Sequence, residues 1–410
     1  MTISHSSQRE TAPTLGGLRI LYVATLCYFT AFGVFYAAIQ LFVRNELHAD
    51  KGSVGLAVGA FSISALLVRP LVGRNIDIRG RRPFLLGALG ILALSSLGFL
   101  MANSVAAVIF LRLFQGAAGG AFYTTAAAVA TDLAPSDKRA GAIARFSLFI
   151  YAGIAIGPSI AELVIDRYGF TTLWFVPATL AVIGIACIWS IPESGTQAMA
   201  TRAKLGKAKM RLLHPAAIGP GLVLMTTGMG YASITGFSSL YARQIELKSP
   251  GLLYAVFAIT VIGGRLISGP LADRSNRTTI SLIGIIFAAA GLGTLALIQV
   301  PTAAFIGVAA FGAGFALIFP ALMAFTVDRV DDHERGEALG SFTAFMDIGT
   351  GGGAFLIGRL ADNFGFGAAY GTPAVLCLIG AVLLTRLGIQ HRKTLEAKDV
   401  DVDVFALPVD

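Results

Sequence analysis

Long uninterrupted apolar segments constrain this chain more than any other feature of its sequence. Each has about 20 residues, the length that an α-helix needs to cross the hydrocarbon core of a bilayer. Apolar residues run through these segments continuously and do not alternate with polar ones, which excludes a transmembrane β-barrel. We place twelve spans near 18–43, 53–72, 83–102, 105–128, 141–163, 170–192, 216–242, 251–271, 278–299, 303–326, 337–358 and 368–390.

The composition agrees with a protein whose main solvent is lipid. Of the 410 residues, 55% are hydrophobic and 13% are charged, and the mean hydropathy is +0.75. A soluble domain has about a quarter charged residues. The first span is too long for the apolar core of a signal peptide, so we expect it to be retained. These features predict an all-α membrane protein.

The Lys and Arg residues predict the orientation of the spans. When the N-terminus is placed in the cytoplasm, most of the 31 Lys and Arg residues fall on cytoplasmic segments. Cytoplasmic loops are enriched in these residues, so we expect both termini to be cytoplasmic. The same distribution explains the net charge of +8 without a nucleic-acid partner. The opposite side receives only Arg44, Lys51, Arg167, Arg243, Lys248 and Arg359.

The second half of the sequence repeats the first. One constant shift of 196 residues aligns charged residues and glycines of the two halves. This pattern indicates an internal repeat of six spans, and parallel repeats of this kind are one architecture of secondary transporters. The shift places Arg69 on Arg265, Gly73 on Gly269, Asp77 on Asp273, Arg81 on Arg277, Asp132 on Asp328, Gly153 on Gly349 and Gly157 on Gly353.

The repeat divides the chain into two six-helix halves. Halves of the same orientation need a cytoplasmic connector, and a basic, less apolar stretch between them provides one. We therefore predict a cytoplasmic N-terminal tail, an N-terminal six-helix bundle, a cytoplasmic linker, a C-terminal six-helix bundle and a cytoplasmic C-terminal tail at 1–17, 18–192, 193–215, 216–390 and 391–410.

Several kinds of site are missing from the sequence. The three cysteines lie far apart in apolar segments, which indicates small buried residues and neither disulfides nor a metal site. The histidines do not cluster, and there is no phosphate-binding loop. We therefore expect no metal, no cofactor and no ATP-driven pumping, and we expect that the chain is not an enzyme.

Three short motifs resemble those of the major facilitator superfamily. "GRNIDIRGRR" at 73–82 is similar to that family's signature loop between helices 2 and 3, except that Ile78 stands in place of a basic residue. "RLFQG" at 112–116 resembles its helix-4 motif. "GIAIGP" at 153–158 resembles its helix-5 motif, which is associated with exporters that work as antiporters. The resemblance covers about residues 18–390 and implies two six-helix halves that rock against each other.

In that family, the loop after helix 2 helps to hold the halves together on the cytoplasmic side. The resemblance therefore implies a latch of acidic and basic residues, with glycines that allow the tight exit from helix 2. The alternative is that these charges only set topology and loop shape. Resemblance and repeat together assign the latch to Gly73, Asp77, Gly80, Arg81, Arg82, Asp132, Asp273, Arg277 and Asp328.

The helix-5 motif also has a packing interpretation. Gly153 and Gly157 lie one turn apart and leave a groove in which another helix can approach, and Pro158 can bend the helix. Helix 11 has a matching glycine run at 349–353. We expect the two glycine-rich helices to form pliable seams between the halves. Ordinary close packing, without bearing on the direction of transport, is the alternative.

Charge deep inside a span is costly and usually functional, and three charged residues are our candidates for such a role. Asp347 is the first candidate for proton coupling, because a buried carboxyl can bind a proton and release it as solvent access alternates. Its cation partner must come from another helix, and Arg112 is a candidate. Arg112 and Glu162 lie at similar depths and are also candidates for an ion pair. The alternatives are a static Arg112 and a neutral, hydrogen-bonded Asp347.

In the same family, helices 1, 4, 7 and 10 line the central cavity. Here these helices offer aromatic side chains and few charges, which suits a lipophilic organic molecule better than a polyanion. Packing and lipid contact are the alternative roles of these side chains. The cavity candidates are Phe32, Tyr36, Gln40, Tyr123, Tyr231 and Phe237.

These observations predict a secondary active transporter of the plasma (inner) membrane that exports a small organic compound in exchange for protons by alternating access. Its partners are expected to be the substrate, protons and the lipid bilayer, and we expect a monomer. The alternatives are a proton-coupled uptake symporter or a sugar or metabolite efflux permease of the same fold. A membrane sensor or scaffold is disfavoured, because no extramembrane segment is long enough for a signalling domain.

Overall fold

The computed structural model describes residues 15–135, 138–194, 213–274, 276–330 and 334–405, and every regular element in these ranges is helical. A π-helical turn follows the first α-helix and a 3-10 turn follows the third. The α-helices are α1 (Leu15–Leu41), α2 (Lys51–Arg79), α3 (Arg82–Gly98), α4 (Val105–Asp132), α5 (Arg139–Leu173), α6 (Phe175–Trp189), α8 (Pro215–Gln244), α9 (Gly251–Arg274), α10 (Arg277–Leu297), α11 (Pro301–Val327) and α12 (Arg335–Phe405).

Two of these helices are interrupted by a glycine. The backbone leaves helical geometry at Gly169 in α5, where φ is 75°, and at Gly365 in α12, where φ is 77°. Glycine adopts positive φ at little cost, and the shift of 196 aligns these two glycines. Each of the twelve predicted spans lies mainly in helical structure, and a few, such as 170–192, extend beyond the end of the helix. Among the described residues, eight helices are long and apolar enough to cross a membrane by length and composition.

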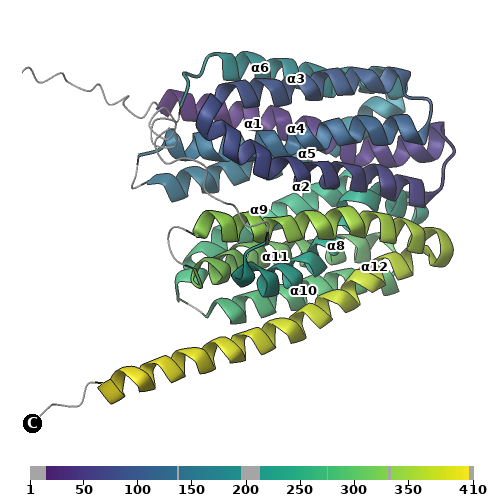
Figure 1. Ribbon diagram of the computed structural model, residues 1–410. Helices are drawn as coiled ribbons and strands as arrows, with labels where there is room; N and C mark the ends of the chain where they lie inside the picture. The colour runs from purple at the N-terminus through teal and green to yellow at the C-terminus, as the bar shows by residue number, and fades with distance from the viewer. Residues whose placement is uncertain (1–14, 136–137, 195–212, 275, 331–333, 406–410) are drawn as a thin grey trace, which may run out of the picture.

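Figure 1 shows the helices in two layers, one formed by α1–α6 and the other by α8–α12. In the first half, α1 packs against α5 and α6, and α3 packs against α4 and α6. In the second half, α8 packs against α12, and α10 packs against α11. The halves meet where α2 packs against α12 and α5 against α9, and we call these two contacts the seams. Most of the predicted linker, residues 195–212, lies outside the described ranges.

The last helix continues beyond the predicted end of the last span. We expected a tail from residue 391, whereas α12 runs to Phe405 and projects from the bundle in Figure 1. The segment 391–405 contains neither glycine nor proline, so its backbone chemistry does not end the helix at the edge of the bundle. At the other terminus, residues 1–14 lie outside the described ranges.

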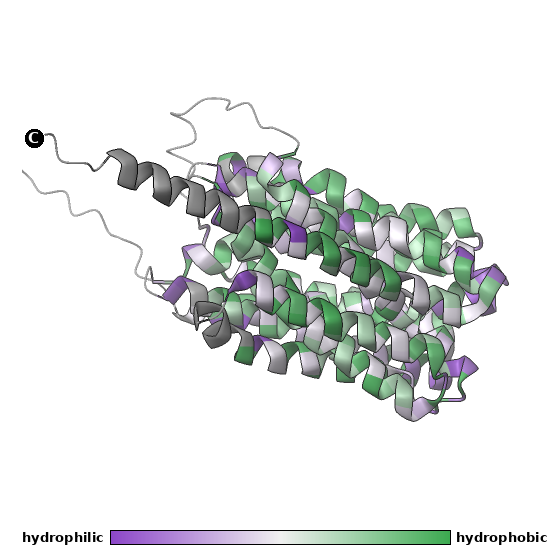
Figure 2. Ribbon diagram, turned by 90° about the horizontal axis from the view of Figure 1, so that it is seen from below, coloured by the Kyte–Doolittle hydropathy of each residue, from purple (hydrophilic) through white to green (hydrophobic). Residues whose placement is uncertain are grey.

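The sides and the ends of the bundle differ in polarity. Large apolar side chains face outward along the sides, as Leu94 of α3 and Ile259 of α9 show, which are 73% and 64% exposed. Figure 2 shows mostly apolar residues along the helices and hydrophilic ones towards the ends, as expected for sides covered by lipid. We call the end at which α2 ends and α3 begins the inner end, because its Lys and Arg residues predict that it faces the cytoplasm. The opposite end is the outer end.

Candidate functional site

Asp347, the first candidate for proton coupling, forms an ion pair across a seam. Its Oδ2 lies 2.7 Å from Nη1 of Arg69, which comes from the inner half of α2. The side chain of Asp347 is 11% exposed and that of Arg69 is 28% exposed. The cation partner in this structure is therefore Arg69, and not Arg112, which was our candidate. A guanidinium and a carboxylate attract each other strongly where little water reaches them.

A second arginine joins the halves at the repeat-related position. Nη2 of Arg265 in α9 donates to the hydroxyl of Tyr151 in α5 at 3.2 Å, and the guanidinium lies 4.9 Å from the centroid of that ring. The shift of 196 aligns Arg69 with Arg265 and Tyr151 with Asp347. The two seams thus hold equivalent arginines, with a carboxylate opposite one and a phenol opposite the other.

Phenol groups connect these two contacts. The hydroxyls of Tyr36 in α1 and Tyr231 in α8 lie 2.8 Å apart, which is a further contact between the halves. Tyr151 lies near both of them and near Tyr123. The ring centroid of Tyr123 lies 5.7 Å from the guanidinium of Arg69. We call the connected group the central cluster; it consists of Tyr36, Arg69, Tyr123, Tyr151, Tyr231, Arg265 and Asp347.

The predicted cavity residues divide between this cluster and the packed interior. Tyr36, Tyr123 and Tyr231 belong to the central cluster. Phe32 packs against Tyr36, with 4.8 Å between the ring centroids. Phe237 has no exposed surface, so it borders no open space, contrary to our expectation.

Gln40, another cavity candidate, is bound to the protein itself. Its side-chain nitrogen donates to the hydroxyl of Tyr254 at 2.8 Å and to the carbonyl of Thr235 at 3.1 Å. Its side-chain oxygen accepts from the backbone N–H of Ser239 at 3.1 Å. The residue is fully buried, and it joins α1 to α8 instead of lining a cavity.

Arg112 and Glu162 do not form the ion pair that their similar depths suggested. Arg112 is buried in α4, where Nη1 donates to Oε1 of Gln115 at 2.9 Å and the guanidinium lies 4.7 Å from the ring centroid of Phe61. Oε2 of Glu162 accepts from the N–H of Gly251 at 2.7 Å. Depth along a helix can be counted in the sequence, whereas the side of the helix that meets a neighbour cannot, and these two residues lie on sides that do not meet.

Carboxylates close both seams at the outer end. Glu162 of α5 binds the N–H of Gly251, the first residue of α9. Asp362 of α12 accepts from the N–H groups of Lys51 at 2.9 Å and Gly52 at 2.7 Å, which begin α2. Helix N-termini have N–H groups without intrahelical partners and a partial positive charge, which stabilise a carboxylate there. Each carboxylate and its N–H partner come from different halves, so the outer end is closed in this structure.

A surface ion pair adds to this closure. Nη1 of Arg359 lies 3.3 Å from Oδ2 of Asp50. Hydrogen bonds from Ser53 lower the pKa of Asp50 below its usual value, so this carboxyl is ionised at neutral pH. The two side chains are 52% and 47% exposed, and an exposed pair of this kind contributes about 1 kcal/mol or less.

Two ion pairs of the predicted latch are formed at the inner end. Nε of Arg81 lies 2.9 Å from Oδ2 of Asp132, and Nη1 of Arg277 lies 2.6 Å from Oδ2 of Asp328. Each pair lies within one half and does not cross a seam. The side chains of the two other latch acids lie outside the described part of the structure; these are Asp77 and Asp273.

The glycines of the loop have different roles. Gly80 has a φ of 90° and turns the chain from α2 into α3, a geometry that glycine adopts most readily. Gly73 lies inside α2, so it does not form the helix exit that we expected there. Arg82 follows the turn and donates to the backbone carbonyl of Trp189 at the end of α6.

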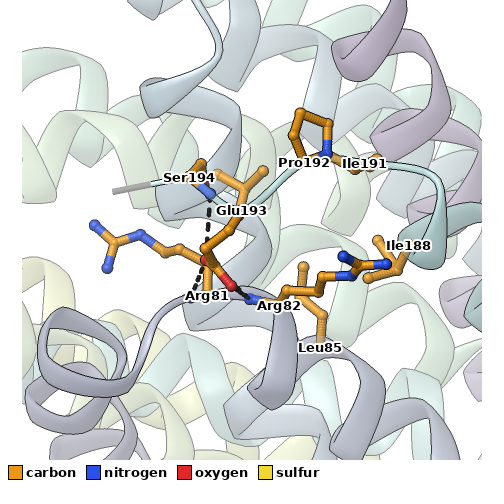
Figure 3. A pocket seen from close by; sticks show the side chains of 9 residues that line it. Arg81, Arg82, Leu85, Ile188, Ile191, Pro192, Glu193 and Ser194 are labelled. Carbon is orange, nitrogen blue, oxygen red and sulfur yellow. Dashed lines mark hydrogen bonds between the residues drawn. The ribbon is translucent and has the colours of Figure 1, made fainter. Parts of the chain in front are cut away.

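Glu193 holds the same loop and was not predicted from the sequence. Figure 3 shows its carboxylate beside Arg81 and Arg82, whose backbone N–H groups donate to it at 2.6 Å and 3.2 Å. The hydroxyl of the next residue, Ser194, donates to Asp132 at 3.3 Å. The start of the linker is therefore bound to the N-terminus of α3. The signal in the sequence is an acid directly after span 6, at the same end of the bundle as the start of α3.

The glycines of the helix-5 motif pack within a half. A Cβ atom on Gly157 would lie 2.5 Å from the carbonyl oxygen of Thr30 in α1, and Gly153 faces α1 in the same way. In the second half, Gly349 and Gly353 of α12 face α8. Our expectation that these glycines form seams between the halves is therefore wrong for these four positions. They allow close packing inside each half.

Other glycines allow the two halves to approach each other. Gly55 and Gly59 of α2 face Ala354 and Gly351 of α12. Gly351 belongs to the glycine run at 349–353 in α12, so one residue of that run does lie in a seam. Pro158, which completes the helix-5 motif, lies inside α5.

Comparison with known sequences agrees with this architecture. The sequence model of the Major Facilitator Superfamily matches residues 21–309 and 221–401. An uncharacterized MFS-type transporter of Salmonella typhimurium is 28% identical over 400 residues, which cover 94% of this chain and 99% of the relative. An uncharacterized MFS-type transporter of Burkholderia mallei is 29% identical over 387 residues, which cover 92% of this chain and 93% of the relative.

Solved structures share the fold at low sequence identity. A variant of the nucleoside transporter NupG superposes with a TM-score of 0.74 and 14% identity, over 90% of this chain and 99% of that one. The human organic anion transporter MFSD10 superposes with a TM-score of 0.68 and 15% identity, again over 90% of this chain and 99% of that one. At these identities the similarity extends to the fold alone.

Two repeat-related halves and the match to this family identify a secondary transporter. It is a multi-pass membrane protein and not an enzyme. The chain belongs to the Major Facilitator Superfamily. The all-α membrane fold predicted from the sequence is confirmed.

Proposed function

We propose that this transporter exports a small, lipophilic organic compound in exchange for protons, by alternating access. The observation that carries the proposal is the ion pair between Asp347 and Arg69, which joins the halves inside the membrane at 2.7 Å. A carboxylate at this position can bind a proton, which neutralises its charge. The attraction to Arg69 is then lost, and the contact between α2 and α12 is weakened.

In the proposed cycle, the two ends of the bundle open in turn. Opening the outer end breaks the contacts of Glu162 and Asp362 with the starts of α9 and α2. A proton then reaches Asp347 from that side, and it leaves to the inner side after the outer end has closed again. The substrate moves in the opposite direction through the central cluster.

The direction rests on the helix-5 motif, which resembles that of exporters working as antiporters. The lipophilic substrate class rests on the aromatic side chains around the central cluster, including Phe32 beside Tyr36. The runner-up is a proton-coupled uptake symporter or a sugar or metabolite efflux permease of the same fold.

We further propose that the protein resides in the inner membrane as a monomer with both termini in the cytoplasm. The orientation is supported by the enrichment of Lys and Arg residues at the inner end. Fusing a reporter that is active only in the cytoplasm to the C-terminus tests this orientation. An active reporter is expected. An inactive reporter on a correctly inserted protein would show that the C-terminus lies on the opposite side of the membrane.

Cells without the protein are expected to retain more of the transported compound. A panel of growth inhibitors is applied to cells with and without the protein. It should reveal compounds to which the cells without the protein are more sensitive. A proton uncoupler should remove the difference, because the proposed export is driven by protons. Faster accumulation in the expressing cells would instead establish uptake.

Loss of a latch charge is expected to slow transport without removing the protein from the membrane. Asp132→Asn weakens the contact with Arg81, and Asp77→Asn removes the acid that the signature loop assigns to the latch. A partly exposed ion pair contributes about 1 kcal/mol, so we expect a rate lowered roughly fivefold in reconstituted vesicles. Glu46→Gln, at the exposed outer end, is the control. Unchanged rates in both latch variants would show that these charges only set topology.

A further inference from the structure

The two carboxylates that close the outer end make different numbers of hydrogen bonds. Asp362 accepts from two N–H groups at the start of α2, those of Lys51 and Gly52, at 2.9 Å and 2.7 Å. Among the described residues, Glu162 accepts from one N–H group alone, that of Gly251 at the start of α9, at 2.7 Å. Asp362 thus makes one more hydrogen bond to the opposite half than Glu162 does.

The start of α9 explains this difference. Pro250, which precedes Gly251, has no N–H group to donate. The residue after Gly251 is Leu252, and its N–H donates to the backbone carbonyl of Ser249 at 3.1 Å. Of these three consecutive residues, Gly251 is therefore the one whose N–H can bind Glu162.

The α2–α12 seam has further polar contacts at the outer end. Nζ of Lys51 donates to the backbone carbonyl of Ala361 at 3.0 Å and lies 4.7 Å from the ring centroid of Phe366. The exposed ion pair of Arg359 with Asp50 crosses the same seam. These contacts do not involve the carboxylate of Asp362, so this seam does not depend on one acid.

The repeat places different residues at equivalent positions of the two seams. The shift of 196 aligns Glu162 with Gly358. At Gly358, α12 approaches α2 so closely that a Cβ atom would overlap the backbone carbonyl oxygen of Lys51. At the equivalent position in α5, Glu162 reaches α9 with its carboxylate instead. The α5–α9 seam thus depends on an acid where the α2–α12 seam has close backbone packing.

One carboxylate oxygen of Glu162 has no partner among the described residues. Oε2 accepts from Gly251, whereas Oε1 is buried and accepts no hydrogen bond. Burying a charged group whose hydrogen bonds are incomplete is costly, and a proton on the carboxyl removes the charge. The bond to Gly251 is then an ordinary hydrogen bond, whereas a charge-assisted one is roughly twice as strong. The attraction to the positive end of α9 is lost as well.

The charged and titratable side chains that lie near Glu162 come from α5, α8 and α9. They are Asp166, one turn further along α5, Arg243 near the end of α8, and Tyr254 in α9. The charge of Arg243 stabilises the carboxylate and that of Asp166 destabilises it, so these two influences oppose each other. Both side chains are exposed, and water and salt weaken their effect.

We propose that the outer end begins to open at the α5–α9 seam, and that a proton bound by Glu162 from the outer side starts this opening. The α2–α12 seam, with its additional contacts, separates later. This inference rests on the proposed function, because it assigns the first step of outer opening in the same transport cycle. Acid on the outer side then favours the state from which the exported compound leaves.

Distances between spin labels test the inference without any transport step. The full-length protein is purified in detergent after its three native cysteines have been replaced by alanine. Labels at the exposed positions 168 and 248, introduced by Tyr168→Cys and Lys248→Cys, span the α5–α9 seam. Labels at the exposed positions 45 and 363, introduced by Asn45→Cys and Asn363→Cys, span the α2–α12 seam.

The distances are measured by double electron–electron resonance at neutral and at mildly acidic pH. Acid should raise the ratio of long to short distances across the α5–α9 seam roughly fivefold, because a neutral hydrogen bond replaces a charge-assisted one. The distances across the α2–α12 seam should change less.

Variants show whether Glu162 is the group that binds this proton. Glu162→Gln keeps the size of the side chain and a hydrogen-bond acceptor but cannot titrate. At neutral pH it should show the long distance as often as the acidified parent does, and acid should not change it further. Asp166→Asn is the matched control, because it removes an exposed acid one turn away on the same helix, and it should still respond to acid. Asp347→Asn should respond as well, since the proton at Asp347 is a separate one.

Equal changes at the two seams of the parent protein would overturn the inference, as would a parent that does not respond to acid. So would a response that persists in Glu162→Gln or is lost only in Asp347→Asn. Acid-induced separation of the α5–α9 seam in a protein without proton-driven export would refute the proposed function and leave the inference intact. Proton-driven export by a protein whose label distances do not change with acid would refute the inference alone.

Discussion

Replacing Asp347 with Asn is expected to abolish accumulation driven by a pH gradient, while substrate still moves down its own gradient. Asn keeps the size of the side chain and can accept a hydrogen bond from Arg69, but it cannot bind and release a proton. The measurement is substrate uptake into vesicles with and without an imposed pH gradient. Stability should fall by about 1–3 kcal/mol, less than the roughly 3–5 kcal/mol for a fully buried pair, because Arg69 is 28% exposed.

In Asp347→Asn, residue 347 can no longer bind a proton and Arg69 loses its charged partner. Two further variants separate these two effects. Combining Asp347→Asn with Arg69→Gln removes both charges, so substrate exchange should persist without coupling to protons. Asp166→Asn changes an exposed acid near the outer end of α5 and should leave exchange and coupling intact. If Asp347→Asn retains full proton-driven accumulation, Asp347 is not the coupling site and Glu162 becomes the next candidate.

Gly157→Leu is expected to prevent the close packing of α1 and α5. A Cβ atom at this position would lie 2.5 Å from the carbonyl oxygen of Thr30 and 2.5 Å from the nitrogen of Val34. These are backbone atoms of a packed helix and cannot move aside singly, so the cost should exceed the roughly 1–3 kcal/mol of ordinary overpacking. We expect little monodisperse protein after extraction from the membrane, measured by size-exclusion chromatography, and a lowered melting temperature.

Gly141→Ala is the matched control in the same helix. The nearest neighbour of its added Cβ atom would be Nη2 of Arg145, at 3.9 Å. Alanine is more favourable than glycine inside a helix by about 0.5–1 kcal/mol, so this variant should be at least as stable as the parent. A Gly157→Leu protein that extracts and melts normally would show that the helix-5 motif does not act through this packing.

The helices could be predicted from the sequence because the bilayer imposes a local rule. About 20 apolar residues must form a helix in lipid, since no other partner is available to their backbone polar groups. All twelve predicted spans accordingly lie mainly in helical structure. The repeat also related distant residues correctly, as the equivalent ion pairs of Arg81 with Asp132 and Arg277 with Asp328 illustrate.

The candidate site was predicted only in part. Asp347 was singled out because it is an acid inside a span, but its partner Arg69 could not be identified, since the two are far apart in sequence. The candidate ion pair of Arg112 with Glu162 is not formed, because the sequence does not show which sides of two helices meet. Glu162 binds a backbone N–H at the start of α9, and every residue type except proline offers such a group. No side-chain pattern marks a contact of this kind.

By itself, the sequence determined the order of the spans, the repeat and the identity of the charged residues inside the membrane. Only the tertiary structure decided which of these residues meet. A helix surrounded by lipid is apolar on most of its surface, so hydrophobic periodicity does not mark the side that packs against a neighbour. Small residues and polar contacts between helices decide the packing instead, as where Gly157 meets α1 and Asp362 binds the start of α2.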